Sequence, residues 1–285
     1  MNFISQIQKP YRSWFPKNLK RKITQIDSIE IDLVSHCNLN CKGCTHFSPI
    51  AEKWFIDVND FKQDIKRVSE ILPDKYVKRM YLLGGEPLLH QEINKILIIS
   101  REAYKKLPIY IITNGFLLDK MDREFWDICC RYNIIIEITK YPVRFDYEKI
   151  KKLMKVHKGK VKIIYKGRTK FLKKKQYKLP LDETGSQDEI YGFTHCHMAG
   201  HCINLAHRHL YTCSYAACMD HFNNYFNKNI PVTEEDGVDI YQNFSTEEVI
   251  RKLTQPIPLC KYCAVKRRTY GNEWASSKRD ITEWV

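Results

Sequence analysis

Three cysteines in one short loop are the feature that most constrains this chain of 285 residues. Cys37, Cys41 and Cys44 are separated by three and then by two residues, directly after an apolar run. Iron–sulfur clusters are normally held by four cysteine thiolates, so a set of three predicts a cluster with one iron atom that lacks a protein ligand. Two other interpretations stay open. One is a zinc site, although such sites usually contain paired cysteines, often with histidines; the other is three buried thiols.

A second motif, Gly84, Gly85, Glu86 and Pro87, follows a predicted strand further along the chain. The two motifs in this order resemble the signature of the radical S-adenosylmethionine (SAM) enzymes. The resemblance implies that the three cysteines hold a 4Fe-4S cluster, and that the second motif contacts the amino group of SAM.

One position departs from the pattern of that family. The residue before the third cysteine is usually aromatic and lies near the adenine of SAM, whereas this chain has Gly43. We expect Phe47 to provide the adenine contact instead. The departure concerns the adenine contact and leaves the cluster prediction unchanged.

Composition indicates a globular protein with reduced cysteines. Hydrophobic residues make up 44% of the chain, which is ordinary for a folded domain. No apolar run reaches the ~18–20 residues of a membrane-spanning helix, and no signal peptide is visible. Eleven cysteines without a secretory signal favour metal ligation over disulfides, so we expect a cytoplasmic protein.

The formal net charge of +14 favours acidic partners, such as phosphorylated substrates, nucleotides, nucleic acid or anionic lipid. A solvated lysine-rich surface is an equally good explanation. Without an RNA-recognition signature, nucleic acid is a minor hypothesis. Residues 1–22 combine aromatic and cationic side chains, which fits a membrane-surface segment or a segment across the mouth of a barrel. The basic run Lys166 to Lys178 fits a phosphate clamp or a solvated loop.

Apolar periodicity predicts strands that alternate with helices, and therefore a parallel α/β sheet. The predicted strands are Ser28–Val34, Met80–Leu83, Ile109–Thr113, Ile134–Thr139 and Val161–Tyr165. In the family that the chain resembles, this sheet curls into a partial (β/α)6 TIM-type barrel. We expect an N-terminal segment at 1–22, the barrel at 23–190 and a C-terminal subdomain at 191–285.

Polar residues at strand ends are further candidates for the site, because barrels of this type place their chemistry at the carboxyl ends of strands. Asn114 follows the third strand, and Glu137 and Thr139 lie on one face of the fourth. The resemblance implies that these residues contact SAM, with Glu137 and Thr139 near its ribose.

A second set of cysteines lies in the C-terminal region. Cys196, Cys213, Cys260 and Cys263 supply four thiolates, which fit a fully ligated cluster or a structural zinc. Their order resembles the twitch form of the SPASM modules that follow many radical SAM barrels, which implies one auxiliary 4Fe-4S cluster.

Cys202 and Cys218 remain outside both sets. Each has three interpretations: a ligand in place of Cys196, a thiol that donates hydrogen to a substrate radical, or a structural thiol.

The resemblance implies a reaction class. The reduced cluster cleaves SAM to a 5′-deoxyadenosyl radical, which abstracts hydrogen from a small polar substrate. A sugar, an aminocyclitol or a nucleotide-linked sugar fits, with dehydrogenation or epimerisation as the outcome. Electrons would come from a flavodoxin- or ferredoxin-type donor. The alternatives are a peptide- or protein-modifying maturase and, from another class, a zinc-containing binding protein.

Overall fold

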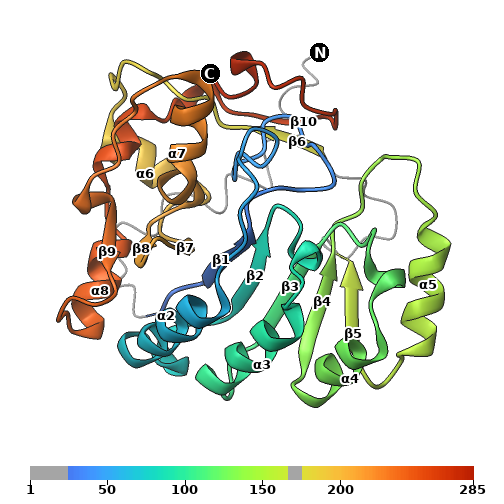
Figure 1. Cartoon of the computed structure of the whole chain (residues 1–285). Helices are drawn as coiled ribbons and strands as arrows, with labels where there is room; N and C mark the ends of the chain where they lie inside the picture. Colours follow the sequence, from blue (N-terminus) through green and yellow to red (C-terminus); the bar gives the residue numbers. More distant parts are fainter. Residues whose placement is uncertain (1–24, 166–174) are drawn as a thin grey trace, which may run out of the picture.

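The structure is a computed structural model that describes residues 25–165 and 175–285 (Figure 1). The predictions for residues 1–22 and for most of the basic run Lys166 to Lys178 lie outside the described residues. Within those residues, no helix combines the length and the apolar character that crossing a membrane requires.

Five parallel strands and the helices between them form the larger part of the molecule. In chain order these strands are β1 (Ser28–Val34), β2 (Met80–Gly84), β3 (Ile109–Thr113), β4 (Ile134–Ile138) and β5 (Lys162–Tyr165). The intervening helices are α2 (Val58–Ile71), α3 (Ile93–Ala103), α4 (Arg123–Arg131) and α5 (Tyr147–Val156). Each strand pairs with the next one in the sequence, and the helices cover one face of the curved sheet (Figure 1). The predicted α/β fold of the partial-barrel type is confirmed.

Successive side chains of each strand point to opposite faces of the sheet, one covered by helices and the other facing the interior of the barrel. On β1, Ile29, Ile31 and Leu33 are fully buried in the same apolar cluster as side chains of α2. Burying each such side chain contributes roughly 1.5–3 kcal/mol. Because side chains alternate across a strand, Glu30 and Asp32 point to the opposite, interior face.

The C-terminal region contributes strands to the same sheet. These are β7 (Cys202–Ala206), β8 (His209–Tyr211) and β9 (Gly237–Asp239), which give the order β5-β4-β3-β2-β1-β7-β8-β9. β7 is parallel to β1, so a sixth parallel strand lies beside β1 rather than after β5. β6 (Lys175–Lys178) instead pairs with β10 (Thr269–Glu273) in a separate two-stranded sheet. The region from 191 onward is therefore hydrogen-bonded into the barrel sheet.

A second apolar core joins the cysteine loop to the end of the chain. The remaining helices are α6 (Glu189–His195), α7 (Ser214–Phe226) and α8 (Thr246–Leu253), and side chains of α7 belong to this core. Phe47 is fully buried there and its ring stacks on Tyr215 at 5.2 Å between centroids. Phe47 therefore has no free face for adenine, and the prediction that it contacts SAM is wrong.

Trp284 connects the last residues to the cysteine loop. It is fully buried, and its indole Nε1 donates a hydrogen bond of 2.9 Å to the carbonyl oxygen of Cys44. We expect Trp284→Phe to lower the free energy of unfolding by about 1–3 kcal/mol, because it removes this buried hydrogen bond and part of the packed indole ring. The Cys44 carbonyl oxygen keeps its second donor, the Phe47 N–H at 3.1 Å.

Anaerobic urea unfolding would measure this loss. Trp54→Phe is the matched control, since Trp54 is 46% exposed and the same substitution there should change stability by less than about 0.5 kcal/mol. Equal losses in the two variants would contradict the anchoring role of Trp284.

Candidate active site

The three cysteines of the first loop lie close together and are partly buried. Burial, and then the negative charges of Glu86, Cys44 and Cys41, raise the pKa of Cys37 well above its ordinary value. The backbone N–H of Leu39 partly offsets this by donating to Cys37 Sγ at 3.3 Å. Thiols with raised pKa values lose their protons when a metal binds, so the donor set fits a thiolate-ligated cluster whose binding releases protons.

Gly84 and Gly85 allow the end of β2 to pack directly against the cysteine loop. The Gly85 N–H donates to the carbonyl oxygen of Val34 at 2.7 Å. A Cβ atom on Gly85 would lie 1.8 Å from the carbonyl oxygen of His36, and one on Gly84 would lie 2.4 Å from that of Val34. Both positions therefore exclude any side chain, and the backbone that they approach is the cysteine loop itself.

Glu86 joins β2 to β3. Its side chain is 1% exposed and accepts hydrogen bonds from Thr113 Oγ1 at 2.6 Å and from the Asn114 N–H at 2.9 Å. Burial raises the pKa of Glu86 to about 7, although these hydrogen bonds oppose the shift. Both oxygens thus accept hydrogen bonds within the protein, so Glu86 positions the end of β3 beside β2. Its expected contact with the amino group of SAM stays a prediction.

Asn114 reaches the cysteine loop, as its place after β3 predicts. Its Nδ2 donates to Asn38 Oδ1 at 2.6 Å and lies 3.9 Å from Cys37 Sγ. The Thr139 N–H donates to the carbonyl oxygen of Thr113 at 2.9 Å, which holds the end of β4 beside the end of β3. Glu137 is paired with Ile112 in the β3–β4 register and lies on the interior face.

The space at Gly43 is filled by the C-terminal segment. Gly43 has φ of +63°, and a Cβ atom there would lie 3.2 Å from the carbonyl oxygen of Glu283. Two backbone hydrogen bonds run beside it, from Lys42 N to Ala275 O and from Ser277 N to Asn40 O, each 3.0 Å long. An aromatic residue at this position would therefore meet both backbone strain and a steric clash.

Tyr141 and Trp274 are site residues that sequence reasoning missed. Burial, and then the charges of Cys41, Cys44 and Cys37, raise the pKa of Tyr141 well above its usual range, which places it beside the cysteine loop. Its ring meets that of Trp274 edge-on at 5.9 Å. Trp274 Nε1 is buried and has no hydrogen-bond partner among the described residues. Its N–H is therefore able to donate a hydrogen bond to a bound ligand. No local pattern marks either residue, because they come from segments far apart in the sequence.

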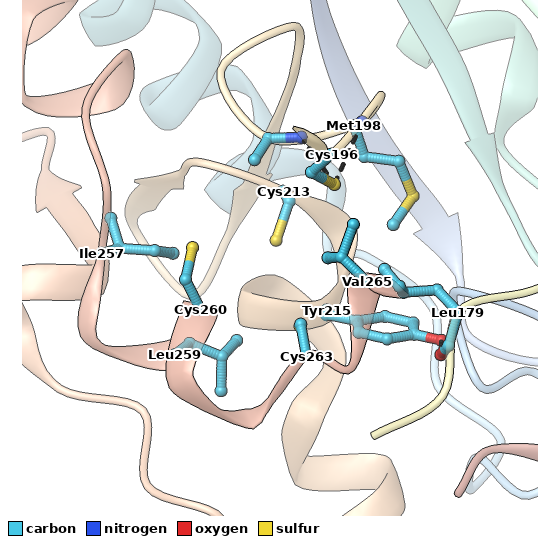
Figure 2. A pocket seen from close by; sticks show the side chains of 11 residues that line it. Leu179, Cys196, Met198, Cys213, Tyr215, Ile257, Leu259, Cys260, Cys263 and Val265 are labelled. Carbon is cyan, nitrogen blue, oxygen red and sulfur yellow. Dashed lines mark hydrogen bonds between the residues drawn. The ribbon is translucent and has the colours of Figure 1, made fainter. Parts of the chain in front are cut away.

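The second set of cysteines surrounds one small cavity (Figure 2). Cys196, Cys213, Cys260 and Cys263 all line it, together with apolar side chains such as Leu259. Burial raises the pKa of Cys260 to about 12, and the pKa values of the other three are also raised. Four thiols around one small cavity supply the number of thiolate ligands that a fully ligated cluster or a zinc ion requires.

Cys202 does not line the cavity of the second set, and it lies at the far end of β1 from the first set. It is the first residue of β7 and pairs with Ser28, the first residue of β1, whereas the cysteine loop follows the last residue of β1. The length of β1 separates them, which is roughly 20 Å at ~3.3 Å per residue. This position supports neither the ligand role nor the hydrogen-donor role considered for Cys202, so a structural thiol is the interpretation that remains.

Cys218 lies on the interior side of β1. It is buried on α7, and its Sγ is 3.5 Å from Asp32 Oδ2, which is also 2.8 Å from His46 Nδ1. The ligand atoms of these three residues lie within 4.8 Å of one another. Of the two candidate thiol donors, only Cys218 is therefore near the loop that carries the first cysteine set.

Comparison with protein families shows that about half of the chain matches one family. Residues 31–176 match the family described as the Radical SAM superfamily. The GTP 3',8-cyclase of Helicobacter pylori (strain ATCC 700392 / 26695) is 31% identical over 102 residues, which is 35% of this chain and 30% of that protein. The GTP 3',8-cyclase of Microcystis aeruginosa is 32% identical over 104 residues, with the same shares of the two chains. The chain thus spans less than a third of the length of these curated relatives.

Among solved structures, the crystal structure of BtrN in complex with AdoMet and 2-DOIA has a TM-score of 0.51. The match covers 84% of this chain and 93% of BtrN, at 17% sequence identity. At this identity the likeness shows a shared fold that extends over most of both chains.

Glu86→Gln tests whether Glu86 positions β3. The substitution keeps the shape but turns an amide NH₂ toward the Asn114 N–H, so one buried donor loses its acceptor. We expect the free energy of unfolding to fall by about 1–3 kcal/mol. Glu92→Gln is the control, since Glu92 is exposed and pairs only with the exposed Lys95 in the part of the chain described. Anaerobic chemical denaturation would measure both variants, and equal stability would refute the role.

Cys196→Ser and Cys202→Ser form a matched pair for the second site. We expect Cys196→Ser to lose the auxiliary metal signal in electron paramagnetic resonance, because a serine hydroxyl is a poor substitute for a thiolate ligand. Cys202→Ser should keep its full iron content. The reverse result would make Cys202 the ligand.

Proposed function

The chain belongs to the radical SAM superfamily, and on that premise we propose that Cys37, Cys41 and Cys44 hold a 4Fe-4S cluster whose fourth iron binds SAM. The superfamily implies both cofactors. The observation that carries the residue assignment is the set of three partly buried thiols on one loop, packed against the two glycines at the end of β2. The zinc-binding alternative would need His36 or His46 as a fourth ligand, whereas the match to the radical SAM superfamily favours an iron–sulfur cluster.

The cofactors supply the difficult chemistry, since one electron from the cluster cleaves SAM to the 5′-deoxyadenosyl radical that takes hydrogen from the substrate. The protein positions them and excludes water. Glu86 and Asn114 hold the cysteine loop against the end of β3. The C-terminal segment covers the loop at Gly43, and Trp274 offers a buried N–H beside Tyr141.

We further propose that Cys196, Cys213, Cys260 and Cys263 hold one auxiliary 4Fe-4S cluster. Four thiolates leave no iron open, so this cluster would serve electron transfer or the shape of the substrate pocket. The surrounding core includes residues of the cysteine loop, such as Phe47 and Ile50. Loss of the auxiliary cluster would therefore disturb the first site as well, because metal binding and folding are coupled.

The proposed substrate is a small polar molecule. The interior face of the sheet carries polar side chains, among them Tyr81 and Tyr110, whose rings lie 5.3 Å apart, and Glu137. The crystal structure of BtrN, which shares the fold, is of a complex with AdoMet and 2-DOIA. These observations favour a sugar, an aminocyclitol or a nucleotide-linked sugar over a peptide.

Dehydrogenation and epimerisation differ in the fate of the substrate radical. A dehydrogenase passes an electron on, for which the auxiliary cluster would be the acceptor. An epimerase needs a hydrogen donor, and Cys218 is the thiol placed for that role, with Asp32 3.5 Å from its sulfur. The proposed electron source is a flavodoxin- or ferredoxin-type protein in a reducing, cytoplasmic setting.

The triple variant Cys37→Ala/Cys41→Ala/Cys44→Ala tests the first site. We expect it to lose about half of the protein's iron, because one of two four-iron clusters is lost, and to release no 5′-deoxyadenosine from SAM. Iron and sulfide analysis and chromatography would measure these outcomes. Cys130→Ala, at an exposed cysteine outside both sets, is the control. Unchanged iron in the triple variant would contradict the assignment.

A further inference from the structure

A cavity of about 1030 Å³ opens beside the cysteine loop. One wall is the loop from Ile50 to Asp57 with the start of α2, and the other is α7 with the turn between β7 and β8. We call it the α2–α7 groove. Its volume is at the upper end of the range for small-molecule sites, which is about 300–1,000 Å³.

Aromatic side chains are concentrated in this groove. Trp54, Phe55, Tyr225 and Tyr241 line it, and each is between 40% and 48% exposed. Among the described residues only three other large hydrophobic side chains are as exposed, and none of them lines the groove. Exposed aromatics gathered in one hollow indicate a binding site. Aromatic rings that lie beside polar side chains suit ligands that carry both C–H groups and hydroxyls.

The charge of the groove is opposite to that of the protein. Six carboxylates line it, whereas the lining contains one lysine, one arginine and two histidines. The carboxylates are Asp32, Glu52, Asp57, Asp60, Asp64 and Asp220. Two of them serve the fold, since Asp57 caps α2 and Asp64 accepts from Tyr241 Oη at 2.8 Å. A hollow with excess negative charge, on a chain of net charge +14, concentrates cationic ligands and repels phosphates.

The base of the groove leads toward the cluster loop. Asp32 and Cys218 line it, and Asp32 Oδ2 contacts His46, two residues beyond Cys44. The other oxygen, Asp32 Oδ1, is buried and has no hydrogen-bond partner among the described residues. A buried carboxylate oxygen without a donor is costly, and a ligand with N–H or O–H groups at the base of the groove would supply one.

We propose that the α2–α7 groove binds the substrate, and that this substrate is a small polyhydroxylated molecule with a protonated amine, such as an amino sugar or an aminocyclitol. The aromatics provide stacking faces, the carboxylates select the ammonium group, and the base places the ligand near the cluster loop. The groove thereby disfavours phosphorylated and nucleotide-linked sugars. The link to turnover rests on the proposed function, whereas the binding itself does not.

Isothermal titration calorimetry without reductant would test the binding. The cationic probes are glucosamine, galactosamine and streptamine; N-acetylglucosamine, glucose 6-phosphate and the peptide Gly-Lys-Gly are the comparisons. We expect N-acetylglucosamine to bind at least about tenfold more weakly than glucosamine, because it lacks the charge-assisted contact. Equal affinity of these two sugars, tighter binding of glucose 6-phosphate or of the peptide, or no binding of any cationic probe at millimolar concentration would overturn the proposal.

Variants locate the site on the protein. Trp54→Ala and Asp220→Asn should each weaken glucosamine binding about tenfold, and both residues are accessible enough for the fold to persist. Tyr270→Ala is the control, at an aromatic residue on β10 that is 61% exposed. Unchanged affinity in both groove variants would overturn the assignment. The triple cysteine variant should keep glucosamine binding, so failure of the cluster assignment and failure of this proposal remain distinguishable.

Discussion

The contact between the end of β2 and the cysteine loop is the constraint on which the rest of the site depends. Two glycines bring the backbone so close that any side chain would overlap a carbonyl oxygen. Glu86 then links the same point to β3, and Asn114 links β3 back to the loop through Asn38. The start of the cysteine loop is thereby held by backbone packing and buried hydrogen bonds.

The end of the chain forms the other wall of the site. Trp284 donates to the Cys44 carbonyl, and residues beyond Trp274 run beside the loop in backbone hydrogen bonds. Gly43 suits that packing, since its φ of +63° and the Glu283 carbonyl oxygen, which would lie 3.2 Å from a Cβ atom there, disfavour a side chain. The aromatic side chains on this side of the loop are those of Tyr141 and Trp274.

The electrostatic environment differs between the cysteine sets, the α2–α7 groove and the rest of the protein. Burial raises the pKa of Cys37 in the first set and of all four thiols in the second set, which couples metal binding to proton release. The α2–α7 groove is acidic although the protein as a whole is strongly basic. Net charge alone predicted an acidic partner, whereas the local field at the groove selects a cation. A ligand a few ångströms from a carboxylate responds to that carboxylate more than to distant lysines, which salt screens.

The sequence by itself determined the strands of the barrel, both cysteine sets and the glycine motif, because each depends on local periodicity or spacing. The tertiary structure alone decided that β7 lies beside β1 and that Phe47 belongs to a core. It placed Cys196, rather than the alternative Cys202, in the lining of the second cavity. It also revealed Trp274 at the cysteine loop and the carboxylates that converge on the groove. These features arise from contacts between segments distant in the chain, and such contacts leave no periodic pattern in either segment.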